Sequence, residues 1–406
     1  MIAFRIENEE LDLEASTSVQ VEYHSGLFET ERIPGMLTFP ITLPWSKKNK
    51  RLLGFPGNLS VRRYRKEPFN CQMYLGNLWR VGKLYILSTS DKGISVNFQS
   101  EVGDLGEGFK NDSLRDLDLG SGFEFAHFKV ANEKFPDNGS VPYPYLVHIL
   151  RQVMLQYGYT VSGSWLEEES TRALVIYNTQ PPDPEQVIYA QHLPDMKVNE
   201  FMKAIRAAFG LGFLFNATTR VMEIVRLRDV IQETAYADWR ERPLQLKGWK
   251  PNDTDGFRLE FKPVREQALA YQVGRGKQVI PINMGTLAMG EDATGVVPTD
   301  SKEPSFDGKF DLVLLSCVSG QGQALVPETL FLECHREWLS FLSETESIET
   351  EISLHITDLR TLRPERKVLV RDGHVPLKAF WTKISVTISL QDGIKTAKAP
   401  LLKVNI

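Results

Sequence analysis

The sequence has 406 residues, of which 42% are hydrophobic and 24% charged, and its formal net charge is −5. These values are typical of a globular chain of roughly two to four domains and argue against wholesale disorder. The acidic balance also disfavours a protein that neutralises duplex DNA, which normally carries a basic excess.

Cysteine usage and the N-terminal residues indicate where the chain folds. Cys71, Cys317 and Cys334 are too few and too scattered for a disulfide framework, and they fit a reducing cytoplasm. The opening segment carries acids where a signal peptide needs positive charge before a long apolar run. No window approaches the ~18 apolar residues of a membrane span. We therefore expect synthesis in the cytoplasm and no membrane segment.

Residues 1–130 are predicted to form an N-terminal β domain. Apolar and polar residues alternate over 19–23 and again over 94–98, so each segment has one apolar face as a strand. Gly76 and Asn77 accept the positive φ of a tight turn, which predicts a hairpin around them. Short strands broken by turns about every ten residues indicate a small barrel or sandwich.

Residues 131–232 are predicted to form an α/β region with two similar units. Apolar residues recur at helical spacing over 146–157, and Gly158 is placed to end that helix in a left-handed cap. The same pattern recurs over 198–209 and ends at Gly210, before a predicted pair of strands. We interpret the two helix–strand units as a weak internal duplication.

Residues 233–406 are predicted to form a C-terminal β domain. Alternating apolar residues predict strands at 257–261 and 352–356, and a turn is expected at 372–373. The segment 274–308 has little periodicity and predicts a long loop that is functional or ordered by a partner. The fold class is therefore α+β, mainly β, with small β-barrel or sandwich domains flanking an α/β middle region.

The common catalytic signatures are missing from the sequence. There is no phosphate-binding GxxxxGK[ST] loop, no GxSxG elbow and no HExxH helix. Cys334, His335 and Cys317 could supply three zinc ligands, but without a CxxC-type pair two packed cysteines and an ordinary histidine are favoured. We therefore expect no catalytic residue, no metal and no cofactor, and predict that the protein is not an enzyme.

Acidic clusters at 167–169 and 344–351 offer a second route to catalysis. A glycosidase needs two carboxylates about 5–10 Å apart across a cleft, and a sequence does not show that spacing. With 52 acidic residues in the chain, some pair always looks plausible. Solvated surface charge is the favoured interpretation.

A basic run with interleaved aromatic residues is the candidate contact surface. Basic residues beside aromatic ones suit a groove for single-stranded nucleic acid. Because the chain as a whole is acidic, contact with a neighbouring subunit or a solvated loop is favoured over nucleic acid. The basic residues are Lys47, Lys48, Lys50, Arg51, Arg62, Arg63, Arg65 and Lys66.

Several segments resemble tail and baseplate hub proteins of tailed bacteriophages and prophages. The Pro-rich stretch 33–56 is similar to the opening of tail proteins from phages of Bacteroidetes-type bacteria. The stretch 143–161 resembles a helix–strand element of the same proteins, 192–216 resembles the helix–hairpin unit of tail-hub proteins in general, and the strands at 368–390 are also similar. None of these is a catalytic motif, and their order along the chain is the stronger signal.

The resemblance implies a structural subunit of a tail or a phage-like injection apparatus. It implies a hub ring, commonly a trimer, that joins the tail tube to the spike or fibres, with transient contact to DNA passing through its channel. The location implied is the virion tail, assembled in the cytoplasm of the bacterial host.

Two alternatives remain open at this point. A receptor- or carbohydrate-binding tail module would expose an aromatic patch, for which Trp239, Trp249, Trp338 and Trp381 are available. A cell-wall hydrolase would need a cleft with a carboxylate pair or a metal. The structural hub is favoured over both.

Overall fold

The structure is a computed structural model that describes most of the chain. The described residues are 2–28, 36–58, 67–76, 78–100, 105, 108–122, 125–129, 140–177, 187–251, 254–261, 269–282, 284–285, 288–289, 296–297, 312–317, 323–389, 393–394 and 396–404.

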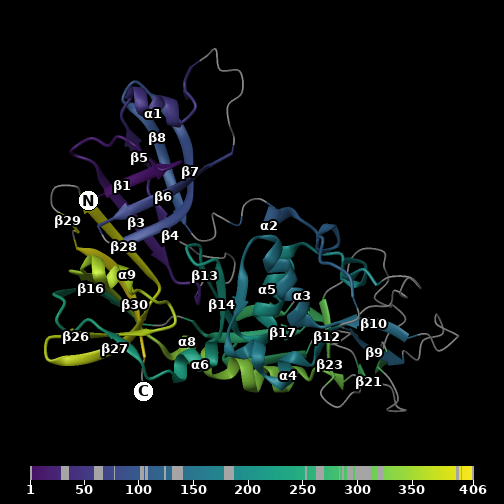
Figure 1. The fold of residues 1–406 in the computed structure, drawn as a ribbon. Helices are drawn as coiled ribbons and strands as arrows, with labels where there is room; N and C mark the ends of the chain where they lie inside the picture. Colours follow the sequence, from purple (N-terminus) through teal and green to yellow (C-terminus); the bar gives the residue numbers. More distant parts are fainter. Residues whose placement is uncertain are drawn as a thin grey trace.

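Three units make up the molecule (Figure 1). An N-terminal β unit, coloured purple to blue, lies at the top of the view, and a C-terminal β unit, mainly yellow, lies at the lower left. An α/β unit in teal and green occupies the lower right. Strands outnumber helices among the described elements, and the predicted α+β, mainly β class is confirmed.

The helices are α1 (Lys47–Leu52), α2 (Gly108–Asn111), α3 (Leu146–Gln156), α4 (Glu169–Arg172), α5 (Val198–Phe209), α6 (Leu227–Gln232), α7 (Pro327–Leu330), α8 (Arg336–Glu344) and α9 (Ile356–Arg360). A π-helical turn, Phe331–His335, joins α7 to α8. Short 3₁₀ turns lie at Leu114–Asp116, Ser164–Glu167 and Tyr189–His192.

The strands of the two β units are β1 (Ile2–Ile6), β2 (Glu9–Glu10), β3 (Ser18–His24), β4 (Met36–Thr38), β5 (Ile41–Leu43), β6 (Phe69–Leu75), β7 (Leu78–Ser90), β8 (Gly93–Ser100), β15 (Tyr236–Asp238), β16 (Leu244–Lys250), β25 (Ser347–Ile352), β26 (Lys367–Asp372), β27 (Val375–Trp381), β28 (Lys383–Ser389), β29 (Gly393–Ile394) and β30 (Ala397–Lys403). The other strands are β9 (Phe125–Lys129), β10 (Ser140–Pro144), β11 (Thr160–Ser162), β12 (Leu174–Ile176), β13 (Leu211–Asn216), β14 (Val221–Arg226), β17 (Gly256–Phe261), β18 (Leu269–Gly274), β19 (Gln278–Ile282), β20 (Met284–Gly285), β21 (Ala288–Met289), β22 (Val296–Val297), β23 (Leu312–Ser316) and β24 (Gln323–Ala324).

The N-terminal unit forms where the local patterns place strands. Val19 and Val21 of β3 are buried, so the predicted apolar face of this strand is confirmed. The hairpin of β6 and β7 is also confirmed, since Leu75 lies opposite Leu78. Gly76 follows Leu75 with a φ of 58°, a backbone conformation that only a residue without Cβ adopts at little cost.

One continuous sheet joins the two β units. It contains 16 strands among the described residues, and β3 pairs antiparallel with β28 so that Val21 lies opposite Val386. Phe98 from the first unit and Trp381 from the second belong to the same cluster of buried apolar side chains. The beginning and the end of the chain therefore share one core, a relation that no local pattern contains.

A strand that follows each of the two predicted helices lies in one small sheet, whereas β12, the apolar strand of the first unit, pairs with β23 in a different sheet. Gly158 and Gly210 follow α3 and α5 with φ of 74° and 57°, as the left-handed caps require. After the first helix, β11 runs parallel to β14, and β14 pairs antiparallel with β13 from the second unit. The apolar stripes of both helices are buried in the shared core. Each fully buried large side chain contributes about 1.5–3 kcal/mol, so packing stabilises these helices more than their caps do.

Packing extends the α/β unit beyond the predicted boundary at 233. Leu259 of β17, Leu314 of β23 and Trp338 of α8 share one buried cluster with Phe201 of α5. The division into domains 1–130, 131–232 and 233–406 stays a prediction. The buried clusters group the residues differently, since one cluster joins the two β units and the other contains the α/β unit with parts of 254–345.

Parts of the C-terminal half differ from the sequence-based expectation. The strand expected over 352–356 ends at Ile352, because the Asp358 carboxylate accepts the His355 backbone N–H at 2.7 Å and the chain enters α9. The expected loop 274–308 contains β19 to β22, and its other parts lie largely outside the described residues. The turn at 372–373 is confirmed between β26 and β27.

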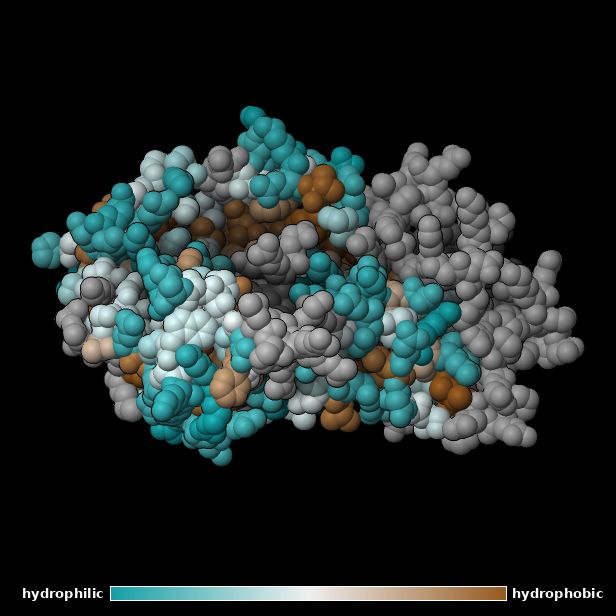
Figure 2. All heavy atoms as spheres, turned by 90° about the horizontal axis from the view of Figure 1, so that it is seen from above, coloured by the Kyte–Doolittle hydropathy of each residue, from teal (hydrophilic) through white to brown (hydrophobic). Residues whose placement is uncertain are grey.

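Most of the coloured residues on the face seen from above are hydrophilic or neutral, and apolar side chains appear in a recessed area between hydrophilic rims (Figure 2). Within the described ranges, no helix is long and apolar enough to cross a membrane.

Candidate functional site

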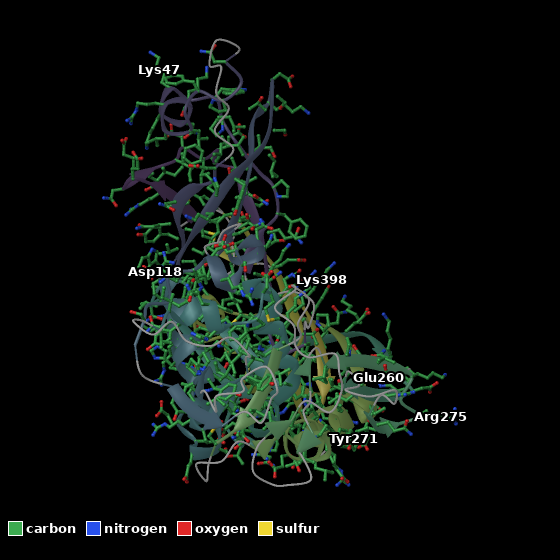
Figure 3. The ribbon with its side chains drawn as sticks, turned by 90° about the vertical axis from the view of Figure 1, so that its right-hand side faces the viewer. Lys47, Asp118, Glu260, Tyr271, Arg275 and Lys398 are labelled. Atoms are coloured by element: carbon green, nitrogen blue, oxygen red, sulfur yellow. The ribbon has the colours of Figure 1, made fainter. Side chains whose placement is uncertain are left out.

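The basic run predicted as a contact surface begins on α1, at the top of the N-terminal unit (Figure 1). Lys47 marks this tip in Figure 3 and lies far from the labelled residues of the other units. Half of the run is described, namely Lys47, Lys48, Lys50 and Arg51. The other half, Arg62, Arg63, Arg65 and Lys66, lies outside the described residues.

A fully buried asparagine anchors α1 to the sheet. The Asn49 amide donates to the carbonyl oxygens of Asp12 and Pro44, both at 3.0 Å, and its Oδ1 accepts the Asp12 backbone N–H at 2.9 Å. The Ser46 hydroxyl accepts the Asn49 N–H at 3.0 Å, which is the usual N-cap bond. The basic helix therefore has a defined position at the tip.

Two of the four described basic side chains have acidic partners within the chain. Lys48 Nζ lies 3.4 Å from Asp12, and Arg51 lies 2.5 Å from Glu9. The Arg51 hydrogen bond holds the pKa of Glu9 below its ordinary value, and hydrogen bonds from Ser46 and then Lys48 do the same for the pKa of Asp12. These exposed pairs contribute little to stability, but they neutralise half of the described charge.

The remaining two cations are available to a partner. Lys50 Nζ lies 5.4 Å from the centre of the Trp45 ring, whose Nε1 donates to the Ser90 carbonyl at 2.7 Å. Within the part of the chain that is described, Lys47 has no acidic partner. The geometry suits contact with an acidic neighbouring surface, and the assignment of this run as a contact site stays a prediction.

The candidate zinc residues do not assemble into a site. Among the described residues no three metal-ligating side chains come together. His335 is buried and its Nε2 donates to the Ala208 carbonyl at 3.1 Å, and burial lowers the pKa of His335 to about 4. Burial raises the pKa of Cys317 to about 12 and that of Cys334 to about 11, so both remain unreactive thiols at neutral pH.

The acidic clusters form exposed ion pairs. Glu167 accepts Arg151 at 2.9 Å and also pairs with Arg172. Glu349 pairs with Lys250 at 2.9 Å on the surface of the C-terminal sheet. This arrangement matches the favoured interpretation of solvated surface charge.

Three of the four tryptophans considered for carbohydrate binding are buried. Trp239, Trp338 and Trp381 lie in the hydrophobic cores. Trp249 on β16 is 54% exposed, so a single ring of this set could meet a ligand.

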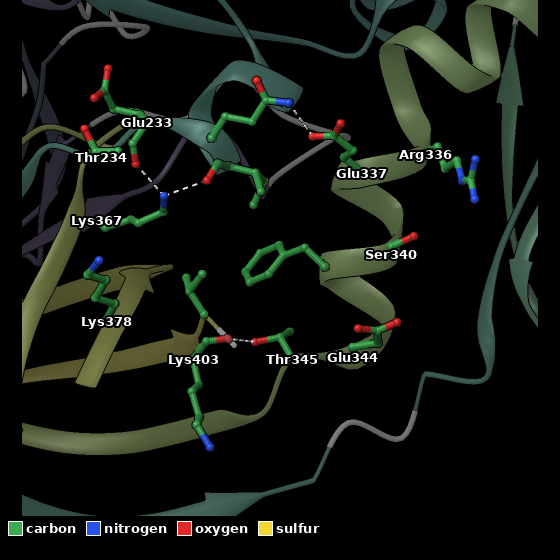
Figure 4. Close-up of a pocket in the computed structure, with 14 residues that line it drawn as sticks. Glu233, Thr234, Arg336, Glu337, Ser340, Glu344, Thr345, Lys367, Lys378 and Lys403 are labelled. Atoms are coloured by element: carbon green, nitrogen blue, oxygen red, sulfur yellow. Dashed lines mark hydrogen bonds between the residues drawn. The ribbon is translucent and has the colours of Figure 1, made fainter. Parts of the chain in front are cut away.

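A pocket of about 620 Å³ between the α/β unit and the C-terminal β unit was not expected from the sequence (Figure 4). One wall consists of neighbouring strands that supply Lys367, Lys378 and Lys403. The opposite wall is α8 with Glu337 and Glu344, and the end of α6 closes one side. Three segments far apart in the chain meet here, so no local sequence signal could have revealed the pocket.

Lys367 ties the two units together inside this pocket. Its side chain is only 2% exposed, and Nζ donates to the carbonyl oxygens of Ile231 and Glu233, both at 2.6 Å. These carbonyls end α6, where the helix leaves acceptors unpaired and its dipole favours a cation. Burial, and then the nearby Lys378 ammonium, lower the pKa of Lys367.

The comparisons with solved structures find tail proteins. A 43 kDa tail protein of prophage MuSo2 from Shewanella oneidensis is 11% identical, with a TM-score of 0.48 over 98% of this chain and 97% of that one. A tail protein from Neisseria meningitidis MC58 is 10% identical, with a TM-score of 0.43 over 99% and 95%. An E. coli component of the type VI secretion system is 9% identical, with a TM-score of 0.43 over 99% and 77%.

Tail proteins are therefore what this chain is similar to. No protein-family model and no curated protein matches the sequence. The sequence predicted a resemblance to phage and prophage tail proteins, and the similar solved structures are proteins of this class. The narrower Bacteroidetes-type label stays a prediction. With TM-scores under 0.5, no residue role is transferred from these structures.

Proposed function

We propose that this chain is a structural subunit of a phage tail or phage-like injection apparatus, where it forms the hub ring joining the tail tube to the spike or fibres. The ring is a trimer in this proposal, and its partners are further copies of the chain, the tube and the spike or fibre proteins. It assembles in the bacterial cytoplasm and resides in the virion tail, and contact with passing DNA is transient.

The observation that carries the proposal is an edge strand of the C-terminal β unit, β16, which lies near β26 without pairing with it. Among the described residues β16 pairs only with β25. A bulge between Leu246 and Gly248 keeps Leu246 opposite Thr350 and Trp249 opposite Ile348. An edge strand with a free side is a template for another chain.

The same strand exposes apolar surface that a neighbouring copy would bury. Thr350 and Ile348 of β25 are buried, so their face of the sheet points toward the core. On β16 that face continues with Leu246 and Trp249, which are 47% and 54% exposed. A closed ring of copies removes both the free backbone groups and this apolar surface from water. The ordered resemblance to tail hub proteins in the sequence supports the same assignment.

The experiment is to replace Trp249 by glutamate and measure molar mass by light scattering, beside negative-stain images. The wild-type chain is expected to form rings, and Trp249→Glu to shift the population to monomers, because a buried unpaired carboxylate costs several kcal/mol. Val375→Glu is the matched control, since Val375 is 67% exposed at the β26–β27 turn.

Two results would contradict the proposal. One is a wild-type chain that stays monomeric at high concentration together with the tube protein. The other is a ring that survives Trp249→Glu unchanged, which would place the subunit contact on another surface. The carbohydrate-binding and hydrolase alternatives gain no specific support from the described tryptophans and acids, and we do not propose them.

A further inference from the structure

Two ammonium groups, those of Lys367 and Lys378, share one wall of the pocket in Figure 4. Lys367 uses two of its three donors for the carbonyl oxygens of Ile231 and Glu233. Lys378 Nζ lies 5.9 Å from the centre of the Tyr236 ring. Among the described residues neither lysine forms an ion pair, and the Lys378 ammonium disfavours the charge of Lys367 more than the Glu233 carboxylate favours it. A bound anion would relieve this repulsion.

The other groups of the pocket restrict which anion fits. The lining contains four basic and three acidic side chains, and Lys403 pairs at 3.3 Å with Glu346 just outside the lining, so the site as a whole is close to neutral. Two of the acids are already engaged, since Glu233 accepts the Ala235 N–H at 2.9 Å and Glu337 accepts the Gln232 amide at 2.8 Å. Lys367 and Lys378, the lining lysines without an ion pair among the described residues, suit one negative charge between them, whereas a phosphate dianion would meet carboxylates on the opposite wall.

Apolar side chains complete the site. Phe341 of α8 and Val404 after β30 line the pocket beside the lysines. They offer a surface for methylene groups, so the best ligand combines one carboxylate with a short apolar stem. Free carboxylate salts and the Asp and Glu side chains of proteins both have this chemistry.

We propose that the pocket binds a glutamate or aspartate side chain of a partner polypeptide, with its carboxylate between Lys367 and Lys378 and its stem against Phe341. The site does not depend on the proposed ring, because all of its walls come from one copy of the chain. Lys378 supplies the selective contact, and Lys367 both holds α6 and offers its third donor.

The test uses fluorine NMR on the full chain with 4,4,4-trifluorobutyrate as the probe. We expect saturable binding of the carboxylate and none of the neutral trifluorobutyramide. Lys378→Met should weaken binding by about tenfold, the usual effect of losing a charge-assisted hydrogen bond. Lys398→Met is the matched control, because Lys398 is an exposed lysine of β30 outside the pocket lining. The affinity of this variant for the probe should stay within about twofold of the wild-type affinity.

A second arm identifies the source of the carboxylate. The peptide acetyl-Leu-Glu-Leu-amide should displace the probe, and its glutamine counterpart should not. Equal binding by Lys378→Met and wild type would overturn the site, provided that circular dichroism shows both chains folded. If Lys378→Met misfolds, Lys378→Gln takes its place. If the glutamate peptide fails to displace the probe, the carboxylate does not come from a polypeptide. If phosphate displaces the probe at a lower concentration than the peptide does, the ligand is not a carboxylate.

Discussion

Replacing His335 by glutamine is expected to remove the part of the acid-induced loss of stability that comes from protonating this buried ring. His335 is the last residue of the π-helical turn, its ring is buried, and its Nε2–H donates to the Ala208 carbonyl at 3.1 Å. Burial lowers its pKa from 6.5 to about 4. A glutamine amide can donate to the same carbonyl and does not titrate.

The sign and size follow from proton linkage. The unfolded chain binds a proton at the ordinary pKa of 6.5, whereas the folded chain accepts it only near pH 4. The contribution of neutral His335 to stability is therefore complete above 6.5 and is lost as the pH falls toward the folded pKa. Because one pKa unit is worth about 1.4 kcal/mol, the whole effect is about 3 kcal/mol.

The assay is urea unfolding followed by tryptophan fluorescence at about pH 7.5 and about pH 4.5. Between these two conditions wild type should lose about 2.5 kcal/mol more unfolding free energy than His335→Gln. His374→Gln is the control, because His374 is exposed at the β26–β27 turn and should leave the pH dependence as in wild type. If wild type and His335→Gln lose the same unfolding free energy between these two pH values, the reasoning is refuted.

Two further predictions concern backbone space and buried hydrogen bonds. Gly210→Ala should lower the free energy of unfolding in urea by about 3 kcal/mol or more, because the new Cβ would lie 2.3 Å from the Cys334 carbonyl oxygen. Gly373 is the control, since its φ is 58° and no atom lies within 4 Å of the added Cβ, so Gly373→Ala should cost about 1 kcal/mol. Equal costs would show that the left-handed backbone alone decides the effect. Asn49→Ala removes three hydrogen bonds and should weaken the tip by about 3 kcal/mol, seen as faster hydrogen exchange across α1, while Lys47→Ala should leave exchange there unchanged.

Features that depend on a few neighbouring residues could be predicted from the sequence. The φ of Gly76 and of Gly158 agrees with the turn and the helix cap that the sequence indicates. The apolar stripe of α5 is buried along its length. In each case the decisive interaction joins residues at most about four positions apart, so the order of residues contains the signal.

The errors have two sources, a local helix cap that the apolar pattern hid and a contact made elsewhere in the chain. The strand expected through Ile356 ends at Ile352 because the Asp358 carboxylate accepts the His355 N–H and starts a helix. The helix α8 lies in a segment expected to be strand or loop, and burial of Trp338 against the α/β core stabilises it there. Patterns of a few apolar residues fit either structure until the packing partner is known.

The candidate site divides in the same way. The basic residues of α1 could be found as a run in the sequence, but their neutralisation by Glu9 and Asp12 depends on how β2 and its following loop pack. The pocket could not be found at all, because Lys367 and Lys378 acquire their common wall only when β26 and β27 pair.

The sequence by itself determined the local structure of this protein: its hairpins, its capped helices and the faces that must leave water. Only the tertiary structure decided what those faces pack against, from the pairing of β3 with β28 to the tie between Lys367 and the end of α6. The physical reason is that the hydrophobic effect has no direction. An apolar face gains free energy on any dry surface, and the choice among surfaces belongs to the whole chain.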